Sequence, residues 1–254
     1  MITHWLIPVG GIDPRKVKLS YLHAVVSGWM EDDLDDHRAE RKQWSLTPIT
    51  QVDGVAAIHV VTLTESAYTV MASAAPAGEI RLGSQHGVVL GRPVVAGGVT
   101  VDDILDTPVE RAHCVVFRTP TALRNKDCIS PLLEPYRLVG SAVKRWNSLV
   151  ADSARQLEHG VAPSEIWVSD LDGRNEVMKV HGITVSGFVG RMRFVCENDN
   201  AAQLFSRIWA FAEHAGIGAY TPHGLGCVAR EDTWQPREPR RPARPRRAQA
   251  RISA

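Results

Sequence analysis

The chain has 254 residues, of which 44% are hydrophobic and 22% charged, a composition typical of a globular protein and unlike that of a disordered one. No apolar run reaches the roughly 18 residues of a membrane-spanning helix, and residues 1–9 lack the basic start and long apolar core of a signal peptide. The four cysteines form no C-x-x-C pair, which argues against a zinc knuckle and a dense disulfide framework. We therefore expect a cytoplasmic protein that has no membrane partner.

The net charge of +1 hides an uneven distribution of charge along the chain. Residues 235–254 hold seven arginines, four prolines and one acid, which leaves 22 basic and 27 acidic residues, a net charge of −5, in residues 1–234. With so few apolar side chains the last 20 residues cannot bury enough surface to offset chain entropy, so we predict a disordered basic tail. Such a tail either contacts phosphates without sequence preference or serves solubility alone.

The first half of the remaining chain begins with a predicted strand at residues 2–9. Asp13 followed by Pro14 is typical of a helix start, with Asp as the cap. One apolar helix face follows at spacing i, i+3, i+4 and i+7, formed by Leu22, Val25, Val26 and Trp29. Further strands are predicted at residues 45–49, 56–63, 80–82 and 87–90, with a second helix at 64–73 capped by Thr64. Residues 97–108 are interpreted as the exit from this half.

The second half repeats this pattern. A strand is predicted at residues 112–117, and the helical spacing returns at Val139, Ala142, Val143 and Trp146. Strands follow at 165–168, 177–183 and 190–195, and a last helix after them. Each half therefore reads β-α-β-β-α-β. We predict an α+β protein with two tandem ferredoxin-like (RRM-like) domains, residues 1–108 and 109–234, followed by the tail at 235–254.

A glycine-rich segment lies between the last helix and a final apolar strand, with four glycines in eleven residues: Gly216, Gly218, Gly224 and Gly226. Glycine accepts positive φ and has no Cβ, so such a segment can turn backbone N–H groups toward a phosphate. The order of helix, loop and strand is the reverse of the dinucleotide-binding motif, and no Walker motif occurs. The alternative is a glycine-rich turn that only packs tightly.

This segment, GIGAYTPHGLGCV at residues 216–228, resembles the C-terminal glycine-rich motif of the RAMP superfamily and, within it, of the CRISPR repeat-processing endoribonucleases of the sixth Cas family. FRTPT at 117–121 resembles the F-x-T-P-T strand of that family, RWN at 145–147 its R-W-N helix, and KQWSLTPI at 42–49 its K-p-F-s-i-S-P-L strand. The resemblance covers residue 1 to about residue 230 and leaves out the tail.

The resemblance implies a metal-independent endoribonuclease without cofactors that cleaves CRISPR repeat RNA in a precursor transcript and releases guide RNAs. The 2′-OH of RNA is a built-in nucleophile, so such a site needs a base, an acid for the 5′-oxygen and positive charge near the phosphorane. The products would be a 5′-OH and a 2′,3′-cyclic phosphate. The implied partners are the repeat hairpin and, less directly, other Cas effector subunits or a second copy of the chain.

The resemblance places His37 at the catalytic histidine of the family, Lys42 at its transition-state cation and Ser27 near its first-helix tyrosine or serine. Arg38 and Arg41 are substitutes for Lys42. The chain departs from the family at Asp36, where an apolar residue is usual, and residues 31–36 hold five carboxylates. These carboxylates should favour the imidazolium and raise the pKa of His37, which suits a general acid. His23, near the apolar face of its helix, is a second catalytic candidate.

Two other functions remain open at this stage. One is a non-catalytic RAMP RNA-binding subunit of a CRISPR effector, and the other is a metal-dependent nuclease that uses Asp32, Asp36 and His37. All of these functions require RNA binding. Tyr220 can stack on a base. Arg191 and Arg193 alternate on a predicted strand, so both face the same side of it. The predicted RNA-binding residues are Arg38, Arg41, Arg118, Lys144, Arg145, Arg191, Arg193, Gly216, Gly218, Tyr220, His223, Gly224 and Gly226.

Overall fold

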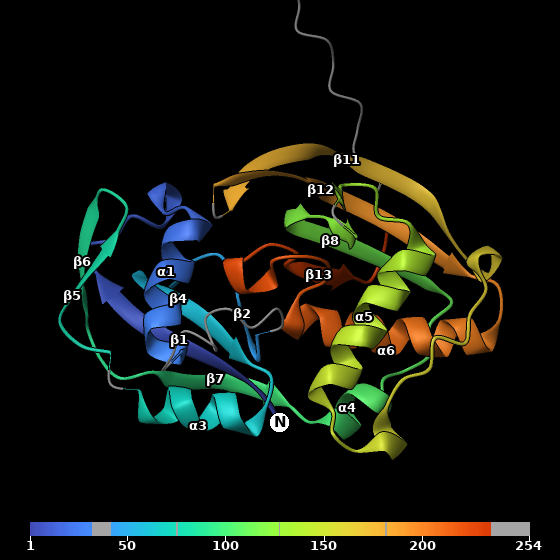
Figure 1. Ribbon diagram of the computed structural model, residues 1–254, viewed down its shortest axis with the longest axis horizontal. Helices are drawn as coiled ribbons and strands as arrows, with labels where there is room; N and C mark the ends of the chain where they lie inside the picture. The colour runs from blue at the N-terminus through green and yellow to red at the C-terminus, as the bar shows by residue number, and fades with distance from the viewer. Residues whose placement is uncertain (32–41, 75, 127, 181, 235–254) are drawn as a thin grey trace, which may run out of the picture.

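Two halves of similar topology make up the computed structural model, which describes residues 1–31, 42–74, 76–126, 128–180 and 182–234 (Figure 1). The N-terminal half contains β1 (Ile2–Gly10), α1 (Leu19–Met30), β2 (Trp44–Leu46), β3 (Thr50–Val52), β4 (Val55–Thr62), α3 (Glu65–Ser73), β5 (Glu79–Leu82), β6 (Gln85–Val89), β7 (Val94–Val99) and α4 (Val101–Leu105). The C-terminal half contains β8 (Ala112–Thr121), β9 (Leu123–Asn125), β10 (Cys128–Ser130), α5 (Pro135–Leu149), β11 (Ile166–Val180), β12 (Ile183–Cys196), α6 (Asp199–Ala215) and β13 (Val228–Glu231).

The two main sheets share one strand order. In the N-terminal sheet the order is β2-β4-β1-β6-β5, and in the C-terminal sheet it is β11-β12-β8-β13, with antiparallel pairing throughout. In both sheets the first strand of the half lies at the centre, which is the ferredoxin-like arrangement. Figure 1 shows α5 and α6 packed on one face of the C-terminal sheet. The predicted α+β class and the β-α-β-β-α-β pattern are confirmed.

The apolar cores explain why the halves stay together. The N-terminal core contains Trp5, Ile7 and Leu22, with side chains from the inner face of β1 and from α1. The C-terminal core under α5 and α6 also includes Ile2, Val61 and Leu63, which belong to the N-terminal half. Buried apolar surface therefore continues across the junction and holds the two sheets against each other.

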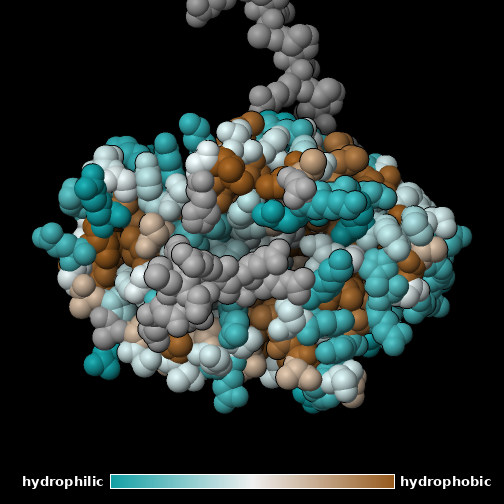
Figure 2. Space-filling view, viewed as in Figure 1, coloured by the Kyte–Doolittle hydropathy of each residue, from teal (hydrophilic) through white to brown (hydrophobic). Residues whose placement is uncertain are grey.

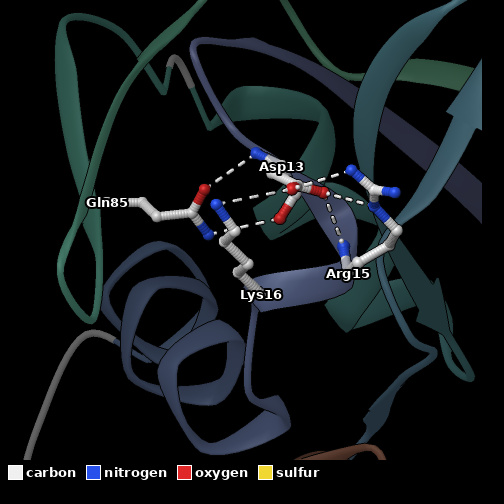
Figure 3. A network of polar contacts seen from close by, with 4 residues as sticks. All are labelled: Asp13, Arg15, Lys16 and Gln85. Carbon is white, nitrogen blue, oxygen red and sulfur yellow. Dashed lines mark hydrogen bonds and ion pairs between the residues drawn. The ribbon is translucent and has the colours of Figure 1, made fainter.

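The start of the first helix differs from the prediction. Asp13 caps a short 3-10 turn, Pro14–Lys16, and α1 begins only at Leu19. The Asp13 carboxylate accepts hydrogen bonds from Arg15, and its backbone N–H donates to Gln85 Oε1 at 2.8 Å (Figure 3). Asp13 is thus fixed against the turn before β6, and the chain must extend before it can start α1. By contrast Thr64 caps α3 as predicted, because its hydroxyl accepts from the Ala67 N–H at 3.2 Å.

The strands of the second half are also longer than predicted. The predicted strands at 165–168 and 177–183 are not separate: residues 166–168 and 177–180 lie on the single strand β11, and the chain turns at Gly182 into β12, which begins at Ile183. The polar residues between these two segments hide the continuous strand from a search for apolar periodicity.

Residues 97–108, predicted as the exit from the first half, contain the end of β7 and all of α4. No helix within the described ranges is long and apolar enough to cross a membrane.

Candidate functional site

A pocket of about 1050 Å³ opens where α1, the β9–β10 hairpin, α5 and the glycine-rich loop of residues 216–227 (the glycine loop) meet. Its lining includes six cationic side chains: Lys42, Arg124, Lys126, Arg137, Lys144 and Arg145. Three histidines also line it: His23, His159 and His223. No Asp or Glu from the described ranges takes part in the lining, although residues 1–234 are net negative. The pocket is therefore a local concentration of positive charge that suits a polyanion.

One face of α5 supplies much of this charge. Arg137, Gly140, Ser141 and Lys144 follow one another at i, i+3, i+4 and i+7, so they share a face that borders the pocket. The core-facing side of the same helix is buried: Leu138, Val139, Ala142, Val143 and Trp146. Figure 2 shows hydrophilic side chains gathered over the outer side of this helix. The same amphipathic pattern that folds α5 onto its sheet thus presents a basic face to the pocket.

The glycine loop is shaped by close backbone contacts. A Cβ at Gly226 would collide with the carbonyl of Ile217, and one at Gly218 with the carbonyl of Ala122, while both residues have positive φ. The loop amides mostly donate within the protein, such as Ile217 N to Gly226 O at 2.9 Å. Only the amides of residues 218, 220 and 221 donate to no described residue. Most loop amides are therefore used within the protein, as in the tightly packed turn given as the alternative, and phosphate binding by the amides of residues 218, 220 and 221 stays a prediction.

Three rings in contact join the glycine loop to the N-terminal half. His23 of α1 lies between Trp44, at a centroid distance of 5.6 Å, and His223, at 3.6 Å. Its Nδ1 is 3.0 Å from the carbonyl oxygen of Pro222. Cys227 adds a contact across the junction, because its thiol donates to the carbonyl of Leu46 at 3.2 Å. Burial raises the pKa of this thiol to about 11, so it stays a neutral donor.

The predicted catalytic residues differ in whether they lie at the pocket. Lys42 lines the pocket, and its Nζ lies 3.0 Å from Glu31 Oε1, with both side chains almost fully buried. The Ser27 hydroxyl donates to the carbonyl of His23 inside α1, and Ser27 does not line the pocket. His37, Arg38 and Arg41 lie outside the described residues. The structure thus brings Lys42 to the pocket and leaves Ser27 in the helix.

Three predicted RNA-binding arginines lie elsewhere, on the face of the C-terminal sheet opposite α5 and α6 (the open sheet face). Arg191 pairs with Glu231 and lies over the Trp234 ring at 5.1 Å, and Arg193 lies 3.5 Å from Asp170. Arg118 is exposed beside a second cavity of about 780 Å³, whose lining includes Arg191, Glu231 and Asp232. The prediction that Arg191 and Arg193 share a face is confirmed, but that face is not the pocket.

A family model for the CRISPR-associated endoribonuclease Cas6 matches residues 115–228, which run from β8 through α5 and α6 to the end of the glycine loop and the first residue of β13. Over these residues the chain is therefore similar to the Cas6 family. Members of that family are CRISPR-associated endoribonucleases. The predicted family resemblance is confirmed over this range, which contains the pocket residues of the C-terminal half.

Solved Cas6 structures share the fold over nearly their whole length. A Cas6 product complex has a TM-score of 0.76 and 22% identity, covering 91% of this chain and 99% of that chain. A Cas6 H37A mutant has a TM-score of 0.69 and 22% identity, and Thermus thermophilus Cas6 a TM-score of 0.69 and 19% identity. Both cover 91% of this chain and 98% of that chain. No curated protein sequence matches the chain.

The pocket also contains residues that the sequence did not indicate. These are Arg124, Lys126, Tyr136, Arg137 and His159. The spacing of seven between Arg137 and Lys144, with small residues at 140 and 141, was a usable signal for a basic helix face. The β9–β10 hairpin gave none, because its strands have three residues each. The predicted residues Lys144, Arg145, Gly218, Tyr220 and His223 do line the pocket, whereas Gly216, Gly224 and Gly226 lie behind it in the loop.

The metal alternative rests on residues that are not described. Within the described ranges no group of three His, Cys, Asp or Glu side chains is arranged to hold a metal ion. Asp32, Asp36 and His37, which carry that alternative, lie outside those ranges, and so does the tail at 235–254.

Proposed function

We propose that this protein cleaves repeat RNA in the CRISPR precursor transcript without a metal ion. In this reaction a 2′-OH of the RNA gives its proton to water and attacks the adjacent phosphate, the bond to the 5′-oxygen breaks as that oxygen receives a proton from the protein, and a 2′,3′-cyclic phosphate and a 5′-OH form. The observation that carries the proposal is the pocket lining, with six cations, three histidines and no carboxylate among the described residues. Such a lining attracts the RNA backbone and stabilises charge that develops on a phosphorane.

His37 remains the proposed proton-transfer residue. His37 precedes Lys42 by five positions, and a chain of that length spans at most about 17 Å, so the pocket lies within its reach. Lys42 itself lines the pocket. One Cas6 protein of the same fold was solved as an H37A mutant, which marks a histidine of interest in that protein. We propose that His37 donates a proton to the 5′-oxygen, as its acidic neighbours Asp35 and Asp36 favour the imidazolium.

The positive charge near the phosphate is proposed to come from several side chains. The Lys42 ammonium is paired with Glu31, which offsets part of its charge. Arg145 holds the glycine loop through a hydrogen bond to Thr221 Oγ1, and Lys144 beside it is exposed. We therefore assign transition-state charge stabilisation to Lys42 and Arg145 together, with Lys144 binding the RNA backbone.

A cleavage assay in EDTA tests the proposal. The wild-type chain is expected to cut its cognate repeat RNA in EDTA and to leave a 2′,3′-cyclic phosphate that acid opens. His37→Ala should slow cleavage about 10²–10⁴-fold, the usual effect of losing a positioned acid or base, while RNA affinity stays the same. His86→Ala, which replaces an exposed histidine of β6, is the matched control and should cleave normally.

Each contrary result points to a different function. If EDTA stops cleavage by the wild-type chain, the metal-dependent alternative replaces this proposal. If the wild-type chain binds the repeat tightly and never cuts it, the chain is a non-catalytic RNA-binding subunit. If His37→Ala cuts at the wild-type rate, the acid belongs to another residue, with His23, His159 and His223 as the histidines already in the pocket.

A further inference from the structure

The end of the pocket formed by the first turn of α5 carries two aromatic rings in contact. The Tyr136 and His159 rings lie 4.5 Å apart between centroids at an interplanar angle of 78°. His159 Nε2 also lies 3.2 Å from the carbonyl oxygen of Tyr136. Both side chains line the pocket. The His159 ring is thus held edge-to-face against Tyr136, and the pair behaves as one unit.

This pair is accessible and has room built for it. Tyr136 is 37% exposed, a large fraction for an aromatic ring on a helix. A Cβ at position 140 would approach His159 Nε2 to 3.3 Å, so glycine there leaves space for the imidazole beside α5. A T-shaped contact uses the edge of one ring, which leaves ring faces open to a third planar group.

The other tyrosine of the pocket is arranged differently. The Arg124 guanidinium lies over the Tyr220 ring, 5.4 Å from its centroid, and also donates to the Tyr220 hydroxyl at 2.9 Å. One face of Tyr220 is therefore covered by a cation. Tyr136 has no such cover from the described residues, so it is the ring better placed to receive a planar ligand.

We propose that Tyr136 and His159 form a stacking platform for one unpaired nucleobase of the RNA substrate. The inference rests on the proposed function, because it assumes that RNA occupies the pocket. It adds that the substrate must present an unpaired nucleotide beside its paired stem, and that this nucleotide helps to fix the register of cleavage.

The neighbouring charges favour a nucleobase over a phosphate at this position. Arg137 and Lys144 follow Tyr136 along α5 by one and eight residues, and they supply the cations that a backbone phosphate needs. The Tyr136 ring can stack on any base, and Tyr136→Phe separates this role from a hydrogen bond of its hydroxyl to a phosphate. Proteins that recognise RNA usually hold unpaired bases on aromatic side chains of this kind. Arg137 and Lys144 can thus bind the phosphates of the RNA backbone, while Tyr136 and His159 next to them receive an unpaired base.

The test combines protein variants with an abasic scan of the cognate repeat RNA. Tyr136→Ala should weaken binding about 10-fold, within the range for the loss of one base–aromatic stack, and His159→Ala should weaken it less. Tyr136→Phe keeps the ring and should bind like the wild-type chain. Leu132→Ala, three residues before α5 and 72% exposed, is the matched surface control and should also bind normally.

The abasic scan separates stacking from a structural role. For the wild-type chain, one unpaired position should cost about 10-fold in affinity when its base is removed. For Tyr136→Ala the same removal should cost nothing further, because the partner ring is already absent. A 2-aminopurine placed at that position should be quenched by the wild-type chain and not by Tyr136→Ala.

The inference is overturned if Tyr136→Ala binds like the wild-type chain, or if every abasic position costs both proteins the same. A wild-type chain that neither binds nor cuts the repeat would instead refute the proposed function. The two failures are therefore distinguishable.

Discussion

The pocket between the halves and the open sheet face both carry several cationic side chains, but they differ in the acids around those cations. In the pocket, Arg137 and Lys144 share a lining that contains no carboxylate among the described residues. On the open sheet face, Arg191 and Arg193 lie beside Glu231 and Asp170. The two regions are therefore not distinguished by their number of arginines. We assign the proposed RNA site from the balance of charge around those arginines.

Nearby carboxylates disfavour RNA binding through the electrostatic field that they produce at the phosphate, and not through the strength of each ion pair. An exposed ion pair is worth only about 0–1 kcal/mol, so an arginine can leave its partner for a phosphate. The carboxylate stays behind, however, and repels the phosphate at the same distance. In the pocket, Lys42 also has a carboxylate partner, Glu31. Glu31 is buried, however, and does not line the pocket.

Charge reversal in the two regions is the largest predicted difference. Arg137→Glu with Lys144→Glu should weaken repeat RNA binding on the order of 100-fold at low salt, because two cations of the pocket become repulsive. Arg118→Glu with Arg193→Glu, the matched pair on the open sheet face, should weaken binding less than 10-fold. Fluorescence anisotropy with labelled repeat RNA measures both.

The same pair of variants can also break the comparison. Equal losses of affinity would mean that RNA contacts both regions, and a larger loss from the sheet-face pair would reverse the assignment. Thermal melts check that neither double variant is unfolded.

Three histidines at the junction of the two halves differ from those of the pocket, and we expect a smaller effect from them. His4 lies 2.9 Å from His59 and 2.7 Å from His214 between ring nitrogens, so three rings from β1, β4 and α6 connect the halves outside the pocket. Burial, and then the charges of His59 and His214, lower the pKa of His4 to about 4. Burial also lowers the pKa of His59 and His214. These rings therefore add little to the positive field at neutral pH.

This junction makes stability depend on pH. The unfolded chain binds protons near the ordinary histidine pKa of 6.5, while the folded chain resists them until about 4 for His4. The stability contributed by the neutral rings is thus complete above pH 6.5 and is lost as the pH falls through 4. We expect Tm to fall on going from pH 7 to 5, and His4→Asn to reduce that fall by roughly 2–4 °C.

The control for this measurement is His86→Asn, because His86 is exposed on β6. It should keep the wild-type dependence of Tm on pH. A His4→Asn variant with the same dependence would show that the junction histidines do not set it.

The sequence predicted the parts of the fold that depend on local pattern. The repeated β-α-β-β-α-β order follows from apolar periodicity, and Thr64 caps α3 because a cap needs only the next three residues. Asp13 was misread for a nonlocal reason, since Gln85 fixes it 72 residues away. The long β11 was missed because its outer residues are polar.

The candidate site depends on contacts that no local pattern contains. The charge on Arg191 is offset by Glu231, 40 residues later in the chain. The glycine at 226 is required by the carbonyl of Ile217, which a motif does not show. Arg124 and Lys126 reach the pocket only because the β9–β10 hairpin folds beside α5. The rest of the lining thus required the structure, while the sequence indicated the resemblance to the family and seven residues of the lining: His23, Lys42, Lys144, Arg145, Gly218, Tyr220 and His223.

The most direct test of where RNA binds is photo-crosslinking of repeat RNA that carries 4-thiouridine, followed by mass spectrometry of the linked peptides. We expect crosslinks in residues 123–145 and 218–223, which hold the lining from the β9–β10 hairpin, α5 and the glycine loop. Crosslinks confined to the open sheet face, in the peptides of Arg118, Arg191 and Arg193, would contradict this expectation.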